Sequence, residues 1–109
     1  MKFLLLLYGD DEGEQALGPE GLRRVVDEHV AFGERLRKSG ALVVSEALRR
    51  QPKTRRGGLV TDGPFAETKE QLGGFYLLEC AGESEALAWA GQVPDSPGLV
   101  VEVVPVAGL

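Results

Sequence analysis

Short apolar runs separated by turn residues make up most of this chain. The first run, residues 2–8, is apolar after Lys2 and ends at Gly9-Asp10. Runs of this length that stop at turn residues are typical of β-strands, and a run without polar alternation indicates burial on both faces. The pattern predicts five strands, at residues 2–8, 41–48, 59–61, 74–80 and 99–106, with loops at residues 9–18 and 49–58.

Between Pro19 and Gly40 the apolar residues change from runs to a helical period. Apolar residues and the single histidine recur every three or four positions, which places them on one helix face that we expect to meet the sheet. Pro19 suits the first turn of a helix, and Gly40 suits its C-terminal end. A second helix is predicted from an N-cap at Ser84 to Pro94. The residues on the first helix face are Leu22, Val25, His29, Phe32 and Leu36.

The predicted order is strand, helix, strand, short strand, strand, helix, strand. This order favours an α+β fold of the ferredoxin-like kind, with an antiparallel sheet and two helices on one face. The opposite face has no helix to cover it, yet residues 3–8 and 99–104 contain Glu102 as their only charge. A sheet face exposed to water should alternate apolar and polar residues. We therefore expect a homodimer packed through this open sheet face; the alternative is a monomer with an unusually apolar surface.

Length and net charge limit the classes to which this protein can belong. Residues 1–109 are expected to form one globular domain. The net charge of −5 argues against nucleic acid as a direct partner, because phosphate binding requires basic excess. The apolar N-terminal run is too short for a signal peptide or a membrane span, which favours a cytoplasmic protein. Cys80 has no partner for an internal disulfide, and we interpret it as a small buried hydrophobic residue rather than a reactive thiol.

The segment from Val60 to Tyr76 resembles the signature of the YCII-related, or DGPF, family. It contains Asp62-Gly63-Pro64-Phe65, then Ala66-Glu67-Thr68-Lys69-Glu70 and Gly73-Gly74-Phe75-Tyr76. The resemblance extends over essentially the whole chain. It implies a ferredoxin-like fold that dimerises in the manner of dimeric α/β-barrel proteins, and a pocket of unassigned purpose. Some relatives occur beside extracytoplasmic-function sigma factors, which links the family to transcription by association only.

In the wider family, a histidine on the first helix and an aspartate have suggested enzymatic activity. His29 matches the histidine, and Asp62 matches the aspartate of the DGPF signature. The aspartate of the wider family has Val93 as its counterpart here, so that second acid is missing. Val104 replaces the arginine usual before the last proline, and the loop before the signature looks shortened, which weakens any anion-binding role carried over from relatives.

His29 and Asp62 are the candidate catalytic residues. The imidazole can accept or donate a proton near neutral pH, and the carboxylate could orient it and raise its basicity. The alternative for His29 is an inert core histidine, and the alternative for Asp62 is a turn carboxylate that bonds nearby backbone amides. The pairing requires the loop around Asp62 to fold back over the first helix.

Five further residues are candidates for ligand binding. Three of them are ionisable and close to Asp62, although such clusters are often solvated; the other two are aromatic and could wall a pocket or simply pack in the core. Residues 49–56 concentrate positive charge, either as an exposed loop or as a clamp for an anionic substrate or acidic partner. No metal-ligand cluster, phosphate-binding glycine loop or nucleophile elbow is found, so we expect no metal or nucleotide cofactor. The five candidates are Tyr8, Phe65, Glu67, Lys69 and Glu70.

These observations support two hypotheses of function. One is a small cofactor-free enzyme that moves protons on a small organic molecule, by isomerisation, dehydration or lyase action. The other is a dimeric ligand-binding or regulatory module, associated with transcription and without catalytic activity. The two differ in whether His29 and Asp62 meet in an open pocket.

Overall fold

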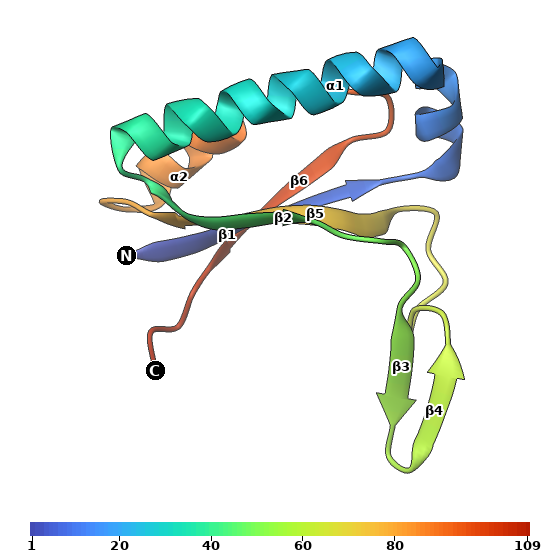
Figure 1. The fold of residues 1–109 in the computed structure, drawn as a ribbon. Coiled ribbons are helices and arrows are strands. Elements are labelled where there is room, and N and C mark those ends of the chain that lie inside the picture. The colour runs from blue at the N-terminus through green and yellow to red at the C-terminus, as the bar shows by residue number, and fades with distance from the viewer.

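Residues 1–109 form an α+β structure in the computed structural model, with both helices on one face of a sheet (Figure 1). The elements are β1 (Lys2–Gly9), α1 (Asp11–Ser39), β2 (Leu42–Ala47), β3 (Lys53–Arg56), β4 (Leu59–Asp62), β5 (Gln71–Glu79), α2 (Glu83–Ala90) and β6 (Val100–Pro105). The main sheet has the strand order β2-β5-β1-β6, and all of its neighbouring strands are antiparallel. Apart from the β3–β4 hairpin, the order of elements is β-α-β-β-α-β, the ferredoxin-like arrangement. The predicted α+β class is therefore confirmed.

The sequence pattern predicts a loop at residues 9–18, and this prediction is wrong for most of the segment. α1 begins immediately after Asp10, whose carboxylate accepts a hydrogen bond from the Gly13 amide at 2.6 Å. An aspartate in this position satisfies an amide that the first helical turn leaves free. Gly18 then interrupts the helix with φ of 66° and ψ of 177°, which glycine adopts at little cost. A short helical segment therefore turns into the long one that starts at Pro19.

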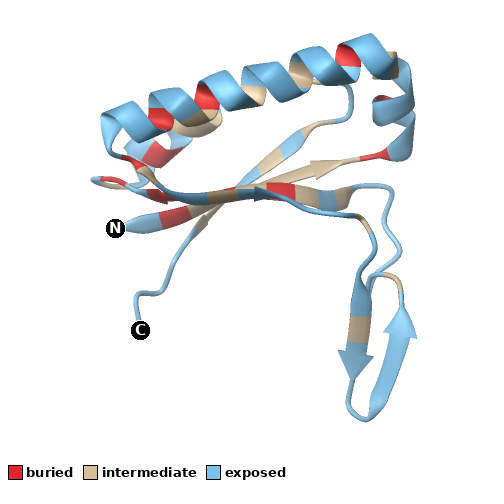
Figure 2. Cartoon of the chain, viewed as in Figure 1, coloured by how far each residue is buried: buried red, intermediate tan, exposed pale blue.

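The basic segment also differs from its prediction. Residues 49–58 are predicted as a loop, but β3 forms within them and pairs with β4. Gly57, with φ of 60°, lies in the turn between the two strands. The hairpin extends from the sheet on the side away from the helices, and nearly all of its residues are exposed (Figures 1 and 2). Its charged first strand lacks the apolar pattern that identifies a strand in a sequence.

α2 is shorter than predicted. Gly82 rather than Ser84 precedes its first turn, and the helix ends at Ala90, before the proline expected to end it. The Glu85 carboxylate accepts a hydrogen bond from the Ala81 amide at 2.8 Å, so it replaces Ser84 as the side chain that satisfies an amide near this end. Neither helix is both long enough and apolar enough to cross a membrane.

The core lies between the C-terminal half of α1 and the sheet. Phe32 and Leu36 of α1 are fully buried there. Burial declines along this face of α1 toward the N-terminus of the helix: His29 is half-buried, and Leu22 is 43% exposed. The helix moves away from the sheet in this direction (Figure 1), so the predicted apolar face meets the sheet at one end only. The largest fully buried side chains are Phe3, Leu5, Phe32, Leu36 and Leu78.

No helix covers the other face of the sheet (Figure 1). Alternation along β1 turns Leu4 toward this open face, and Leu4 is paired with Leu77 on one side and Val104 on the other. Val44 continues the row beyond Leu77 and is 41% exposed. The β3–β4 hairpin and the C-terminal residues both extend on this side of the sheet (Figure 1). The sheet therefore has the open apolar face that its sequence pattern predicts.

Candidate functional site

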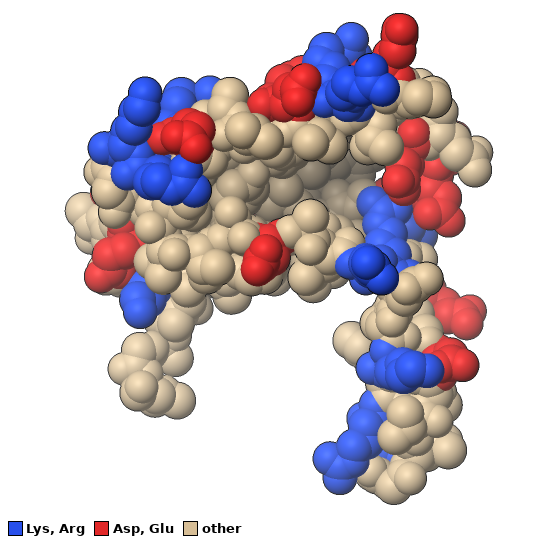
Figure 3. Space-filling view, in the orientation of Figure 1, with Lys and Arg blue, Asp and Glu red and all other residues tan.

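A cleft opens between α1 and the sheet where the helix moves away from the strands. Its volume is about 550 Å³, within the range of small-molecule sites. Figure 3 shows the hollow beneath α1, with charged side chains along its rim. Apolar residues that line it come from α1, from β1 and from the segment before β6: Leu7, Val25, Val26, Val30 and Leu99.

His29 and Tyr76 meet in this cleft, from α1 and β5 respectively. His29 Nδ1 lies 2.7 Å from the Tyr76 hydroxyl oxygen, a short hydrogen-bond distance. The two rings are stacked, with centroids 6.0 Å apart and planes 13° apart. Phe32 packs edge-on against Tyr76 with centroids 5.0 Å apart. The core therefore fixes the Tyr76 ring, and the Tyr76 hydroxyl holds His29 in place.

Burial shifts the proton affinities of both side chains. Tyr76 is 7% exposed, and burial raises the pKa of its hydroxyl to about 12. Burial also lowers the pKa of His29, because the charged imidazolium loses hydration, while the Glu28 carboxylate opposes this shift. At neutral pH the pair is therefore a neutral imidazole and a neutral phenol.

The second ring nitrogen of His29 is free to bind a ligand. Nδ1 contacts Tyr76, but Nε2 has no hydrogen-bond partner within the protein. Every buried side-chain nitrogen or oxygen does have such a partner, so Nε2 is accessible to solvent. The protein thus holds one nitrogen of the imidazole and leaves the other open in the cleft, an arrangement that suits proton exchange or hydrogen bonding with a bound molecule.

Arg50 also lines the cleft, and its side chain is only 25% exposed. Its Nη1 lies 3.3 Å from Glu14 Oε2 and 3.5 Å from Asp11 Oδ1. The guanidinium packs against two glycines: a Cβ at Gly9 would lie 2.8 Å from Nη2, and one at Gly73 would lie 3.6 Å from it. These glycines make room for the guanidinium, and its Nε–Nη2 edge has no acceptor within the protein.

Comparison with known proteins identifies the family. The sequence model of the YCII-related domain matches residues 1–108. The chain belongs to the YCII-related family. It is also 38% identical over 98 residues to the uncharacterized protein R00369 of Rhizobium meliloti (strain 1021), an alignment that covers 83% of this chain and 77% of that protein. The resemblance of residues 60–76 to the family signature is thus confirmed.

In this YCII-related protein, Asp62 does not meet His29. Asp62 ends β4 at the base of the hairpin, and its side chain is 88% exposed and bonded to Lys53. It is absent from the cleft lining. The predicted dyad is therefore not formed within the protomer, because the DGPF turn leaves an exposed hairpin instead of folding over α1. Tyr76 occupies the position that the sequence interpretation gave to the carboxylate.

Of the residues predicted to bind a ligand, only Tyr8 borders the cleft. Its hydroxyl donates a hydrogen bond to Glu102 Oε1 at 3.0 Å, on the neighbouring strand β6. Burial, followed by this bond and the Glu102 charge, raises the pKa of Tyr8. Phe65 is 78% exposed in the segment after β4 and does not wall the cleft.

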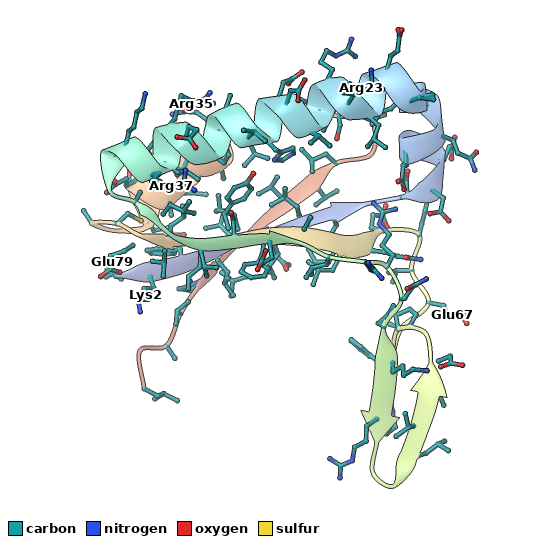
Figure 4. The ribbon with its side chains drawn as sticks, in the orientation of Figure 1. Lys2, Arg23, Arg35, Arg37, Glu67 and Glu79 are labelled. Carbon is teal, nitrogen blue, oxygen red and sulfur yellow. The ribbon has the colours of Figure 1, made fainter.

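The three ionisable residues of the DGPF loop lie outside the cleft lining. Lys69 Nζ lies 3.2 Å from Glu12 Oε2 and 3.7 Å from Asp10 Oδ2, and the hydrogen-bonded Glu12 carboxylate is the main cause that raises the pKa of Lys69. Glu67 and Glu70 are exposed, and Figure 4 shows Glu67 on the outer side of the loop between the hairpin and β5. Lys69 therefore ties this loop to the start of α1.

The sequence interpretation missed Tyr76, and it included Arg50 only within the basic run of residues 49–56 that could clamp an anionic substrate. Tyr76 and Leu78 are two positions apart along β5, so both side chains point to the same sheet face. This is the face that α1 covers. Arg50 belongs to a run of basic residues in which no pattern distinguishes it. Cys80 is buried at 9% exposure beside Phe3, and burial raises the pKa of its thiol, which agrees with its interpretation as a small hydrophobic residue.

Proposed function

We propose that the cleft beneath α1 binds a small organic molecule and that His29 exchanges or shares a proton with it. The observation that carries this proposal is the His29–Tyr76 pair, in which a buried hydroxyl holds one ring nitrogen and the other stays open in an apolar cleft. A neutral imidazole in a partly dehydrated site can act near neutral pH without first losing a proton. Isomerisation, dehydration and lyase reactions of carbonyl compounds are the reactions that such a group serves.

Filling the cleft tests whether it binds ligands. An added Cβ at Gly33 would meet no neighbouring atom, so Gly33→Leu extends a side chain into the cleft without a clash at its root. Ala31→Leu, on an exposed position of the same helix, is the matched control. We expect small carbonyl compounds detected by saturation-transfer NMR to lose binding in Gly33→Leu and to keep it in Ala31→Leu. Binding that survives in Gly33→Leu would place the ligand elsewhere.

Deuterium exchange tests the chemistry. Compounds that bind the cleft should incorporate deuterium from heavy water next to their carbonyl group when the wild-type protein is present, and His29→Gln should abolish this incorporation. Binding without any incorporation in the wild type would favour the second hypothesis, a ligand-binding module without catalytic activity.

The open sheet face supports a homodimer of the dimeric α/β-barrel type. The exposed surface of the chain is 7554 Å². A compact monomer of 11.7 kDa should expose about 5,900 Å². The radius of gyration is 15.1 Å, whereas a compact chain of this length has about 13 Å. The excess surface exceeds the roughly 800 Å² that one partner buries in an ordinary stable interface. The extended β3–β4 hairpin contributes to this excess, and a second copy on the apolar row of Leu4, Val44, Leu77 and Val104 would cover part of it.

Sedimentation analysis tests this assembly. We expect the wild type to be a dimer and Val44→Glu to be a monomer, because the charge would be buried without a partner at the interface. Leu87→Glu is the control, since Leu87 is 52% exposed on α2, away from the open face. A monomeric wild type would contradict the proposal, and so would a dimer that Val44→Glu leaves intact.

A further inference from the structure

The hydroxyl of Tyr76 has one partner in the protein, the Nδ1 atom of His29. Because the hydroxyl is a phenol at neutral pH, it carries a proton that a buried group must donate to some acceptor. Nδ1 is the acceptor within reach. A neutral imidazole that accepts at Nδ1 carries its own proton on Nε2, so the Tyr76 bond selects one of the two tautomers.

This tautomer differs from the one that a carboxylate partner would select. A carboxylate can only accept, so it would bind a proton on Nδ1 and leave Nε2 as a base. With Tyr76 as the partner, the atom that is open in the cleft is an N–H donor. The resting form of His29 therefore presents a hydrogen bond to a ligand oxygen rather than a lone pair to a ligand proton.

The cleft offers further donors beside His29. Three of its four carboxylates are engaged: Asp10 accepts from the Gly13 amide, Glu14 from Arg50 and Glu34 from Arg37. The fourth, Glu46, is exposed and has no partner within the protein. The Nε–Nη2 edge of Arg50 is free, and Glu14 and Asp11 orient the guanidinium through Nη1. Two N–H groups in a plane match the two lone pairs of a ligand oxygen or a carboxylate.

We propose that Tyr76 is a positioning residue that holds the His29 proton on Nε2, and that the cleft thereby recognises a carbonyl or enolate oxygen of its ligand. This inference deepens the proposed function and rests on it for the ligand, but the tautomer belongs to the free protein and is measured without one. His29 then stabilises developing negative charge on the oxygen through its Nε2 proton, and the proton lost from the neighbouring carbon goes to solvent rather than to the imidazole.

The tautomer is open to direct measurement because the chain has a single histidine. A long-range ¹H–¹⁵N spectrum of labelled protein at about pH 8, above the usual histidine pKa, contains one imidazole. We expect Nε2 to give the shift of a protonated nitrogen and Nδ1 that of a hydrogen-bonded acceptor. In Tyr76→Phe, which keeps the ring and removes the hydroxyl, the two shifts should move toward each other as the tautomers exchange. Protonated Nδ1 in the wild type, or an unchanged spectrum in Tyr76→Phe, would overturn the assignment.

Tyr8→Phe is the matched control, because the chain has two tyrosines and the Tyr8 hydroxyl bonds Glu102 instead of His29. We expect its imidazole spectrum to match the wild type. If Tyr8→Phe changes the spectrum as Tyr76→Phe does, the effect is a general response to losing a hydroxyl, and the assignment fails.

Two probes of the same shape test the ligand class. Acetophenone carries a carbonyl oxygen, and α-methylstyrene has a CH₂ group in its place. We expect acetophenone to shift the Nε2 proton resonance and α-methylstyrene to leave it unchanged. Equal shifts from both compounds would overturn the oxygen preference. If Nε2 is protonated but neither compound perturbs any cleft resonance, cleft binding of such ligands fails while the positioning role of Tyr76 stands.

Discussion

Among the short side-chain hydrogen bonds of this protein, two lie in opposite environments. His29 and Tyr76 meet between α1 and β5, where Tyr76 is 7% exposed. Lys53 and Asp62 meet across the hairpin, where their side chains are 72% and 88% exposed. Water competes for the second pair and screens its charges, whereas burial shifts the pKa of both members of the first. The comparison teaches that burial, rather than the presence of ionisable groups in a signature, decides which pair has shifted pKa values.

The largest expected difference between the two pairs is in stability. Tyr76→Ala should lower the free energy of unfolding by about 3–5 kcal/mol, because it leaves a cavity beside Phe32. Asp62→Ala should leave the unfolding free energy within the error of the measurement, because it removes only an exposed ion pair. Urea unfolding of both variants at one protein concentration makes the comparison. Equal losses would mean that the hairpin is structurally coupled to the core.

The pH dependence of stability should carry the signature of the buried pair. The pKa of His29 is lower in the folded state than its usual value of about 6.5, so the unfolded state binds more protons in this window. The stability that depends on His29 is therefore complete above about pH 6.5 and is lost as the pH falls through the lower folded pKa. The slope is below the one-proton limit of about 1.4 kcal/mol per pH unit, since the ring is only half-buried.

His29→Gln removes this titration while all carboxylates remain. We expect the unfolding free energy of the variant, measured in urea between about pH 5 and 7, to be flatter than that of the wild type. A wild type that is equally flat would mean that His29 is not desolvated, and the contrast between the two pairs would weaken.

Sequence periodicity was enough to predict the elements on which His29 lies and packs. It predicted β1, the His29 face of α1 and the α+β class, because each depends on local spacing and burial. The His29–Tyr76 contact joins residues 47 positions apart, and the register of a helix turn over a strand depends on tertiary packing that local spacing does not encode. The prediction that Asp62 of the DGPF segment meets His29 failed for the same reason. Turn residues identify a turn in the sequence but not the surface on which that turn lies.

Arginine offers a third, smaller contrast between the cleft and the hairpin. Arg50→Gln should lower the unfolding free energy by about 1 kcal/mol, through lost packing over the glycines and two lost ion pairs. Arg55→Gln, on an exposed position of β3, should have no measurable effect. Thermal unfolding of both variants gives the comparison. A larger loss for Arg55→Gln would mean that the hairpin is buried in the assembled protein.

The smallest expected effect is the most informative about the signature. In an NMR titration, Asp62→Asn should leave the pKa of His29 unchanged, because Asp62 is exposed, bonded to Lys53 and outside the cleft of its own protomer. Glu28→Gln is the positive control: the Glu28 carboxylate raises the pKa of His29, so its removal should lower that pKa. A fall in Asp62→Asn as well would mean that the hairpin of a partner subunit brings Asp62 to the cleft. The exposed pair would then be exposed only in the free protomer, and the DGPF carboxylate would act on His29 across the dimer.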